Sequence, residues 1–445
     1  MDNTIKNKEL QKEAVNNDFI DILKALTYST IGLIIFFIPI KINNQTATII
    51  YHITYKIQLE ARDIIELSII VYTIIGSLKS FISYKDKKLS IKKIYIYLKM
   101  VSILIILNIF YGKNNIIFLD DITLSVINET ILNLATLLPI SAIFMTFILD
   151  YGLIEIIESY FQKHMKMLFK LSGKSILNIL IYIFTDCFCG FFMTNKLYTQ
   201  GKLRNNEACI ILLNFSILSI PMSIYIIEEL NLNKLDFIVI NIFILFITNI
   251  ILCRIYPLNK KKKSYFIKTN YKETIHKDKK FQRGLEKYLK NPNKENIFIK
   301  IVNNLEESIK LSMDLIPNII IILYISSLFI NNGLIAELLK KIFLPVVQIF
   351  KLQNYNELSE FCVNLFYNNV IAMNTLNLNI EYSTKFLIGI IVVLTCTSLS
   401  TSILYIYNTK IKIDIKEFII SYLERIIVII SIYSMIYYFY IGYII

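Results

Sequence analysis

The 445-residue chain lacks the motifs of a nucleotide-driven machine. It contains no phosphate-binding Gly-Lys-Ser/Thr loop and no Gly-rich dinucleotide-binding turn, and no serine sits in a nucleophile elbow. Each of these motifs places backbone N–H groups or a reactive side chain where a phosphate or an acyl group must bind. Without them, we expect no ATP- or GTP-driven engine in this polypeptide.

Side chains that bind metals are also sparse. His52, His164 and His276 lie far apart in the sequence and have no carboxylate at metal-ligand spacing. Most of the six cysteines fall in apolar segments, where cysteine acts as a small apolar residue, and the pair Cys187 and Cys189 is too sparse for zinc. We therefore expect no metal centre and no cofactor. The apolar segments hold no His/Glu/Asp or Ser/His constellation either, so we expect no enzyme.

What the chain has instead is apolar sequence, with 55% hydrophobic residues and a mean hydropathy of +0.55. A helix needs about 20 mostly apolar residues to cross the hydrocarbon core, because unpaired peptide groups cannot face lipid. About nine segments meet this requirement: 23–40, 64–82, 94–111, 131–148, 208–227, 235–256, 315–330, 386–407 and 418–440. The sequence predicts an all-α, polytopic integral membrane protein, which we expect in the cytoplasmic (inner) membrane.

The formal net charge of +13 is concentrated in one place. Segment 254–300 holds 15 basic and four acidic residues, and it is the only long polar stretch of the chain. Basic loops beside membrane spans stay on the cytoplasmic side and are attracted to anionic lipid headgroups. We therefore predict a basic cytoplasmic loop over residues 257–308 that contacts membrane lipid. No recognition motif accompanies the charge, so nucleic acid is not an expected partner.

Loop charges also predict the orientation of the chain. Lysines within 85–93 place the second connection in the cytoplasm, so the polar tail 1–22 is cytoplasmic too, and it has no apolar core of a cleavable signal peptide. Segment 175–194 is apolar enough to cross, but a crossing would put the following basic connection outside. We therefore predict a re-entrant hairpin that enters and leaves on the cytoplasmic side.

The second half repeats this pattern with the opposite sense. Two segments begin with Gly-Leu-Ile, at Gly152 and Gly333, and both end with the tripeptide Phe-Lys-Leu, which indicates an internal duplication. The charged stretches 153–171 and 334–352 suit amphipathic helices at the membrane surface. Segment 360–376 is too polar to cross alone and holds the place of the first hairpin, so it is predicted to be a second hairpin that enters from outside.

Several runs resemble the YjiH-like membrane proteins of the nucleoside-recognition (Gate) domain group: Leu137-Leu-Pro-Ile-Ser-Ala-Ile-Phe-Met-Thr-Phe-Ile-Leu-Asp-Tyr-Gly152, Phe169-Lys-Leu-Ser-Gly-Lys-Ser175, Thr194-Asn-Lys-Leu-Tyr-Thr-Gln-Gly201 and Asn214-Phe-Ser216. The resemblance covers most of the chain after about Leu23. It implies two inverted Gate-type repeats and the movement of a nucleoside-like solute. The first hairpin departs from the family pattern of small residues, because it is bulky and carries an acid.

These observations divide the chain into five parts. They are the cytoplasmic tail 1–22, amino-terminal transmembrane helices 23–129, a first Gate unit 130–256, the basic loop 257–308 and a second Gate unit 309–445.

Polar groups inside a membrane are costly, so each one warrants a functional hypothesis. Asp186, at the middle of the first predicted hairpin, would meet a cation or an amine there, or would instead cap a helix at the hairpin tip. Asparagine suits recognition of a nucleobase or sugar edge, and it equally suits hydrogen bonds between helices. The predicted solute-binding set is Asn178, Thr185, Asp186, Asn214, Ser216, Asn368, Asn369, Thr397 and Ser398.

Arg425 lies deep in the last apolar segment. We expect it to form a structural ion pair with a carboxylate of the bundle, for which Asp186 is a candidate, or to reach backbone carbonyls. The predicted function is secondary transport of a small polar solute. The alternative is a non-transporting scaffold or a partner subunit of another Gate-domain protein. Expected partners are the solute, lipid, and a companion Gate-domain protein or a second copy of the chain.

Overall fold

The computed structural model describes residues 2–42, 45–82, 91–112, 121–267, 279–290, 295–349, 354–376, 379–396, 398 and 409–442. These parts are almost entirely helical, so the all-α class is confirmed. One short antiparallel hairpin departs from it, formed by β1 (Pro39–Ile42) and β2 (Gln45–Thr48) between α1 and α2 (Ile49–Glu60). The fold is therefore that of a helical protein with several helices suited to a membrane.

Six helices of the described residues are long and apolar enough to cross a membrane: α1 (Asp2–Phe37), α3 (Arg62–Ile82), α5 (Asp121–Leu149), α11 (Lys234–Leu252), α13 (Ile297–Asn332) and α19 (Ile415–Gly442). Each one overlaps a span predicted from the sequence. The predicted span 94–111 lies in α4 (Ile91–Tyr111), whose apolar part, Ile96–Tyr111, is shorter. The other two predicted spans differ from the structure.

The predicted span 208–227 is wrong as one continuous helix. The structure divides it into α9 (Asn205–Asn214) and α10 (Ile220–Glu229), with an unwound stretch between them. Pro221 explains the break, since it has no N–H to donate to the preceding turn and its ring would clash with the carbonyl there. The chain restarts as a helix with Pro221 in its first turn, where no N–H is needed.

The predicted span 386–407 also stops early. α17 (Tyr382–Leu394) ends at Leu394, and Thr395 leaves the helix with φ −123° and ψ 67°. Most of the remaining predicted span lies outside the described residues. The first segment predicted as a single span after a hairpin is therefore two helices, and in the second the described helix ends at Leu394.

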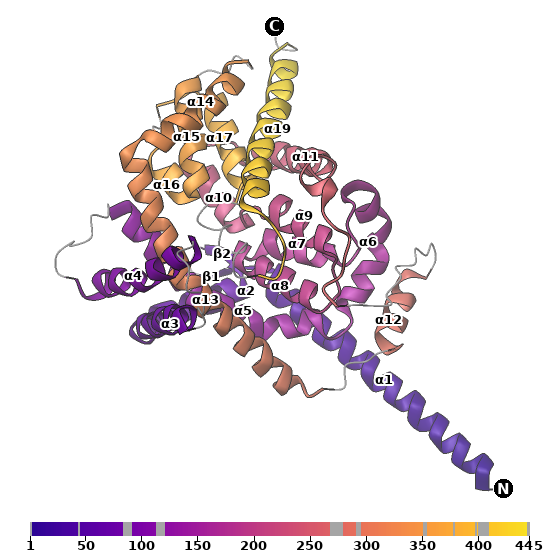
Figure 1. The fold of residues 1–445 in the computed structure, drawn as a ribbon. Coiled ribbons are helices and arrows are strands. Elements are labelled where there is room, and N and C mark those ends of the chain that lie inside the picture. The colour runs from indigo at the N-terminus through magenta and orange to yellow at the C-terminus, as the bar shows by residue number, and fades with distance from the viewer. Residues whose placement is uncertain are drawn as a thin grey trace.

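The buried centre of the molecule is built on α5 and α13, which lie against each other along much of their length. Figure 1 shows α13 running as a long helix past α5 and α3. The α3–α13 contact is close, because a Cβ added to Gly76 would lie 1.8 Å from the main-chain oxygen of Met313. Ser312 on α13 also donates a hydrogen bond of 2.7 Å to the oxygen of Leu134 on α5.

Part of the basic segment is folded onto the protein. Helix α12 (Lys280–Lys290) packs against α6 (Leu153–Phe169), where a Cβ on Gly284 would meet the Cα of Ile156 at 2.5 Å. The ammonium of Lys287 lies 3.6 Å from the buried carboxylate of Glu158. Helix α13 then begins at Ile297, inside the stretch predicted as loop 257–308. Helix α14 (Leu334–Ile349), which holds the matching place in the predicted second unit, packs on α15 (Tyr355–Tyr367).

Candidate functional site

The first predicted hairpin is a pair of short helices that fold back on each other. α7 (Ser175–Phe184) and α8 (Cys187–Thr199) are joined through Thr185 and Asp186. The amide nitrogen of Asn178 on α7 donates to the hydroxyl of Thr194 on α8 across 2.6 Å, which ties the two legs together. The legs approach closely because Gly190 faces the ring of Tyr182, whose carbons an added Cβ would meet at 2.6 Å.

Asp186 is the helix cap of this hairpin. Its backbone is extended (φ −158°, ψ 157°), and its carboxylate accepts a 2.7 Å hydrogen bond from the N–H of Phe188 at the start of α8. This contact satisfies one of the N–H groups that a helix start leaves without a partner. The neighbouring Thr185 hydroxyl donates back to the oxygen of Ile181. The structure therefore gives the acid the capping role that the sequence had left open.

The second hairpin is built in the same way from α15 (Tyr355–Tyr367) and α16 (Asn369–Asn374). Asn368 forms its turn with φ −163° and ψ 142°, and its side-chain oxygen accepts from the N–H of Val370 at 2.8 Å. The legs are again held by an asparagine and a threonine, since Asn364 donates to the hydroxyl of Thr375 across 2.9 Å. Figure 1 shows α15 and α16 grouped with α14 and α17.

The break between α9 and α10 meets the carboxyl end of α17. The N–H of Leu218, in the break between α9 and α10, donates a 2.9 Å hydrogen bond to the oxygen of Val393 at the end of α17. A helix end exposes carbonyls that have no partner within the helix, so another part of the chain must satisfy them. Here the donor comes from the other half of the sequence.

The next two carbonyls, of Leu394 at the end of α17 and of Thr395 just after it, also receive donors from other elements. Arg425 on α19 donates from Nη1 to the oxygen of Leu394 at 2.6 Å, and Asn369 on α16 donates from Nδ2 to the oxygen of Thr395 at 3.1 Å. Three consecutive carbonyls, of Val393, Leu394 and Thr395, thus bind an interrupted helix, a terminal helix and a hairpin tip. We call this stretch the carbonyl junction.

The ion pair predicted for Arg425 is not found among the described residues. Its side chain is only 2% exposed, and it donates a hydrogen bond to the carbonyl of Leu394, which was the other possibility raised by the sequence. The end of α17 explains this choice, because helix carboxyl ends carry partial negative charge and attract cations. The Nε and Nη2 atoms of Arg425 are buried without a protein partner.

A contact between two cysteines joins the same elements. The thiol of Cys187, at the tip of the first hairpin, lies close enough to that of Cys396, just beyond the carbonyl junction, for the two to interact. The sequence gives no sign that these two residues are close, since they belong to different halves of the chain and lie in segments that do not resemble each other. Across the part of the chain that the structure describes, no group of three or more His, Cys, Asp or Glu side chains is placed to hold a metal ion.

The remaining predicted site residues have more local roles. Asn214 is the last residue of α9, and its Nδ2 is buried without a protein partner. The hydroxyl of Ser216 donates to the oxygen of Leu212 across 2.7 Å, so it serves the end of the helix. Ser398 is buried, and its N–H donates to the oxygen of Cys396 at 3.0 Å. Thr397 lies outside the described residues.

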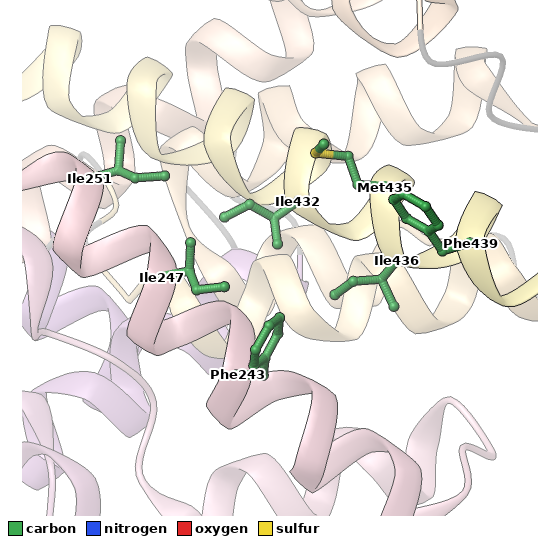
Figure 2. A pocket seen from close by; sticks show the side chains of 7 residues that line it. All are labelled: Phe243, Ile247, Ile251, Ile432, Met435, Ile436 and Phe439. Carbon is green, nitrogen blue, oxygen red and sulfur yellow. The ribbon is translucent and has the colours of Figure 1, made fainter.

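A groove of about 700 Å³ lies elsewhere, between α11 and α19 (Figure 2). Its lining is apolar: Phe243, Ile247, Ile251, Ile432, Met435, Ile436 and Phe439. Such a surface offers no hydrogen bond to a polar solute. It begins about two helical turns beyond Arg425 on α19. We therefore assign the candidate site to the carbonyl junction and the hairpin tips.

The chain is similar to an uncharacterized protein of Alkalihalophilus pseudofirmus, with 30% identity over 128 residues. The aligned part spans 28% of this chain and 28% of that protein, so the chain matches under a third of its relative's length. No family model matches the chain. No solved structure matches it either.

Proposed function

We propose that this protein is a secondary transporter, which moves a small polar solute across the membrane at the carbonyl junction. One observation carries the proposal. The break between α9 and α10 meets the end of α17 there through the Leu218–Val393 hydrogen bond, and the hairpin tips at Asp186 and Asn368 belong to the same two halves. Irregular backbone at membrane depth is tolerated only where protein surrounds it or where it lines a polar path.

The lengths of the hairpin legs support a re-entrant arrangement. α7 has 10 residues and α15 has 13, which corresponds to about 15 Å and 20 Å of helix at 1.5 Å per residue. A hydrocarbon core is about 30 Å thick, so neither leg reaches across it. The cap residues Asp186 and Asn368 would then stand inside the bilayer. Broken helices that end at mid-membrane are typical of solute sites in transporters.

The order of the elements supports two inverted units. Each half has a Gly with positive φ (86° at Gly152 and 68° at Gly333), an amphipathic helix, a hairpin and then a short helix, α9 or α17, in that sequence. An odd number of crossings between the two copies would invert the second one. Alternating access then follows if one unit rocks against the other around the junction. We place the amino terminus and the basic segment on the cytoplasmic side of the inner membrane, as the loop charges predict.

Flux into proteoliposomes tests the proposal. Uridine, adenine and small organic acids are supplied outside, and uptake is compared between the wild type and Asn368→Ala. Asn233→Ala is a matched control, because Asn233 also caps a helix by accepting from Leu235, at 3.1 Å, but is exposed and is not one of the residues of the junction or the hairpin tips. We expect Asn368→Ala to lower uptake and Asn233→Ala to leave it unchanged. A folded protein that moves none of these solutes would instead be the scaffold or partner subunit.

A further inference from the structure

Four polar atoms around the carbonyl junction are buried and have no hydrogen-bond partner within the described parts of the chain. Two are donors, Nε and Nη2 of Arg425, and one is an acceptor, Oδ1 of Asn369. The fourth is the hydroxyl oxygen of Thr395, which can donate or accept. Arg425 is 2% exposed and Thr395 is fully buried. The carbonyls of Leu394 and Thr395 hold the Arg425 and Asn369 side chains at neighbouring peptides, so these atoms belong to one small region.

Leaving such groups without a partner is expensive. A buried, unsatisfied donor or acceptor costs about 1–3 kcal/mol, and more when the group is charged. Arg425 presents five N–H groups and uses one side of its guanidinium on a single carbonyl. The hydrogen bond to the oxygen of Thr395 fixes which end of the Asn369 amide is the nitrogen, because only the nitrogen can donate. Its oxygen therefore requires a donor from elsewhere.

Helix capping alone does not explain this arrangement. Arg254 provides a comparison within the same chain, since it caps helix ends by donating from Nη1 to the oxygens of Leu168 and Ile250 and from Nη2 to that of Met167. Its side chain is exposed, so water can satisfy what the protein does not. Arg425 has one carbonyl and no access to water. An arginine that only caps a helix would not need to be buried with its Nε and Nη2 atoms left without an acceptor.

The unpartnered atoms complement one kind of solute. A guanidinium edge binds a carboxylate through two parallel hydrogen bonds. The free oxygen of Asn369 would accept from a hydroxyl or amino group beside that carboxylate, and the Thr395 hydroxyl would bind either one. We propose that the carbonyl junction binds a small carboxylate that carries a hydrogen-bond donor on the adjacent carbon, with Arg425 as its anchor. This inference names the class of solute for the proposed transporter, and it rests on the proposed function in treating the bound carboxylate as the transported solute.

Binding to the purified protein in detergent tests the inference without requiring transport. The probes are L-lactate, L-alanine, propionate and uridine, and the readout is the shift in the unfolding temperature together with the affinity. Lactate and propionate differ only in a hydroxyl group, so their comparison isolates the donor and needs no mutant. We expect lactate or alanine to stabilise the wild type more than propionate does, and uridine to have no effect.

The variants are Arg425→Gln and the control Arg254→Gln. Arg425→Gln should weaken the binding of lactate or alanine at least about tenfold, because a hydrogen bond to a charged group is worth about 1.5–3 kcal/mol and 1.4 kcal/mol is tenfold. Arg254→Gln should bind like the wild type even if its unfolding temperature falls. If Arg425→Gln does not fold, the comparison of lactate with propionate on the wild type still tests whether the site recognises a hydrogen-bond donor beside the carboxylate.

The possible outcomes distinguish a failure of the proposed carboxylate site from a failure of the proposed transport. Stabilisation by uridine alone, equal effects of lactate and propionate, or carboxylate binding that survives Arg425→Gln would overturn the inference. Uridine uptake that Arg425→Gln leaves unchanged would overturn it too, while the proposed transport would stand. Carboxylate binding lost in Arg425→Gln, without flux of any solute in proteoliposomes, would keep the site and refute the transport.

Discussion

Asp186 and Asn368 hold the same place in two hairpins that lie in different halves of the chain. Each has an extended backbone, and each accepts a hydrogen bond from the N–H two residues later, at 2.7 Å for Asp186 and 2.8 Å for Asn368. An acid in one hairpin and an amide in the other thus perform the same local task. The capping geometry, which both side chains can provide, is the shared requirement.

The first prediction separates capping by Asp186 from a role of its charge. Asp186→Asn should keep the stability of the protein, because asparagine caps as well as aspartate does, whereas Asp186→Ala should lower the free energy of unfolding by about 1 kcal/mol. Denaturant unfolding in detergent measures both. A loss of flux in Asp186→Asn at unchanged stability would show that the carboxylate takes part in transport and that capping is not its whole role.

The second prediction concerns the contact between the legs of the first hairpin. Gly190→Ala should destabilise the protein by about 1–3 kcal/mol, because its Cβ would lie 2.6 Å from the ring of Tyr182. Combining it with Tyr182→Leu should recover part of the loss, since the smaller side chain makes room. Thermal unfolding of both single variants and the double variant gives the coupling. Strict additivity of the two substitutions would mean that the residues do not meet.

The third prediction uses the thiol pair of Cys187 and Cys396. Mercuric ion favours soft thiolate ligands and can bridge two of them, which would fasten the first hairpin tip to the end of α17. We expect mercury to inhibit flux in proteoliposomes, and Cys187→Ser or Cys396→Ser to abolish the inhibition. Cys362→Ser is the matched control, because that cysteine is buried in the second hairpin. Inhibition that depends on Cys362 would contradict the contact.

The fourth prediction concerns a buried lysine on α8. Lys196 is 7% exposed, and its ammonium lies 2.6 Å from the carboxylate of Glu307, which is 58% exposed. Asn304 also accepts from Lys196, and it donates to the hydroxyl of Thr146 across 2.7 Å. These contacts fasten the first hairpin to α13 and α5.

Because the two partners differ in burial, their removal should have unequal effects. Glu307→Gln leaves a buried ammonium without its counter-charge, whereas Lys196→Met leaves a carboxylate that water can solvate. We expect Glu307→Gln to lower the unfolding temperature more than Lys196→Met does. The double variant should resemble Lys196→Met alone. The reverse order of the two single variants would mean that the Lys196 charge is solvated in the folded protein.

The sequence located several of these features through local signals. Loop charges and polarity placed turns within 175–194 and 360–376, and the structure has them at Asp186 and Asn368. Apolar length identified the six long helices, because that signal needs no knowledge of neighbours. Apolar composition predicted 208–227 as one span, whereas the structure has two helices there, because the steric effect of Pro221 outweighs apolar length.

The contacts of the candidate site could not be read from the sequence. The Leu218–Val393 bond joins main-chain atoms, which any residue type supplies. The pairing of Cys187 with Cys396 and the choice of Leu394 by Arg425 depend on how helices from the two halves pack, and no local pattern encodes this. Thr395 was not among the predicted site residues. Its importance follows from its position at the end of α17.

The central claim is that the two hairpins enter the membrane from opposite sides, and site-directed labelling tests it most directly. All six native cysteines are buried, so an impermeant maleimide reports on an added one. Gln200, after α8, and Glu357, in the first turn of α15, are exposed positions at the bases of the two hairpins. We expect Gln200→Cys to be labelled only from the cytoplasmic side and Glu357→Cys only from outside. Labelling of both positions from the same side would contradict the account.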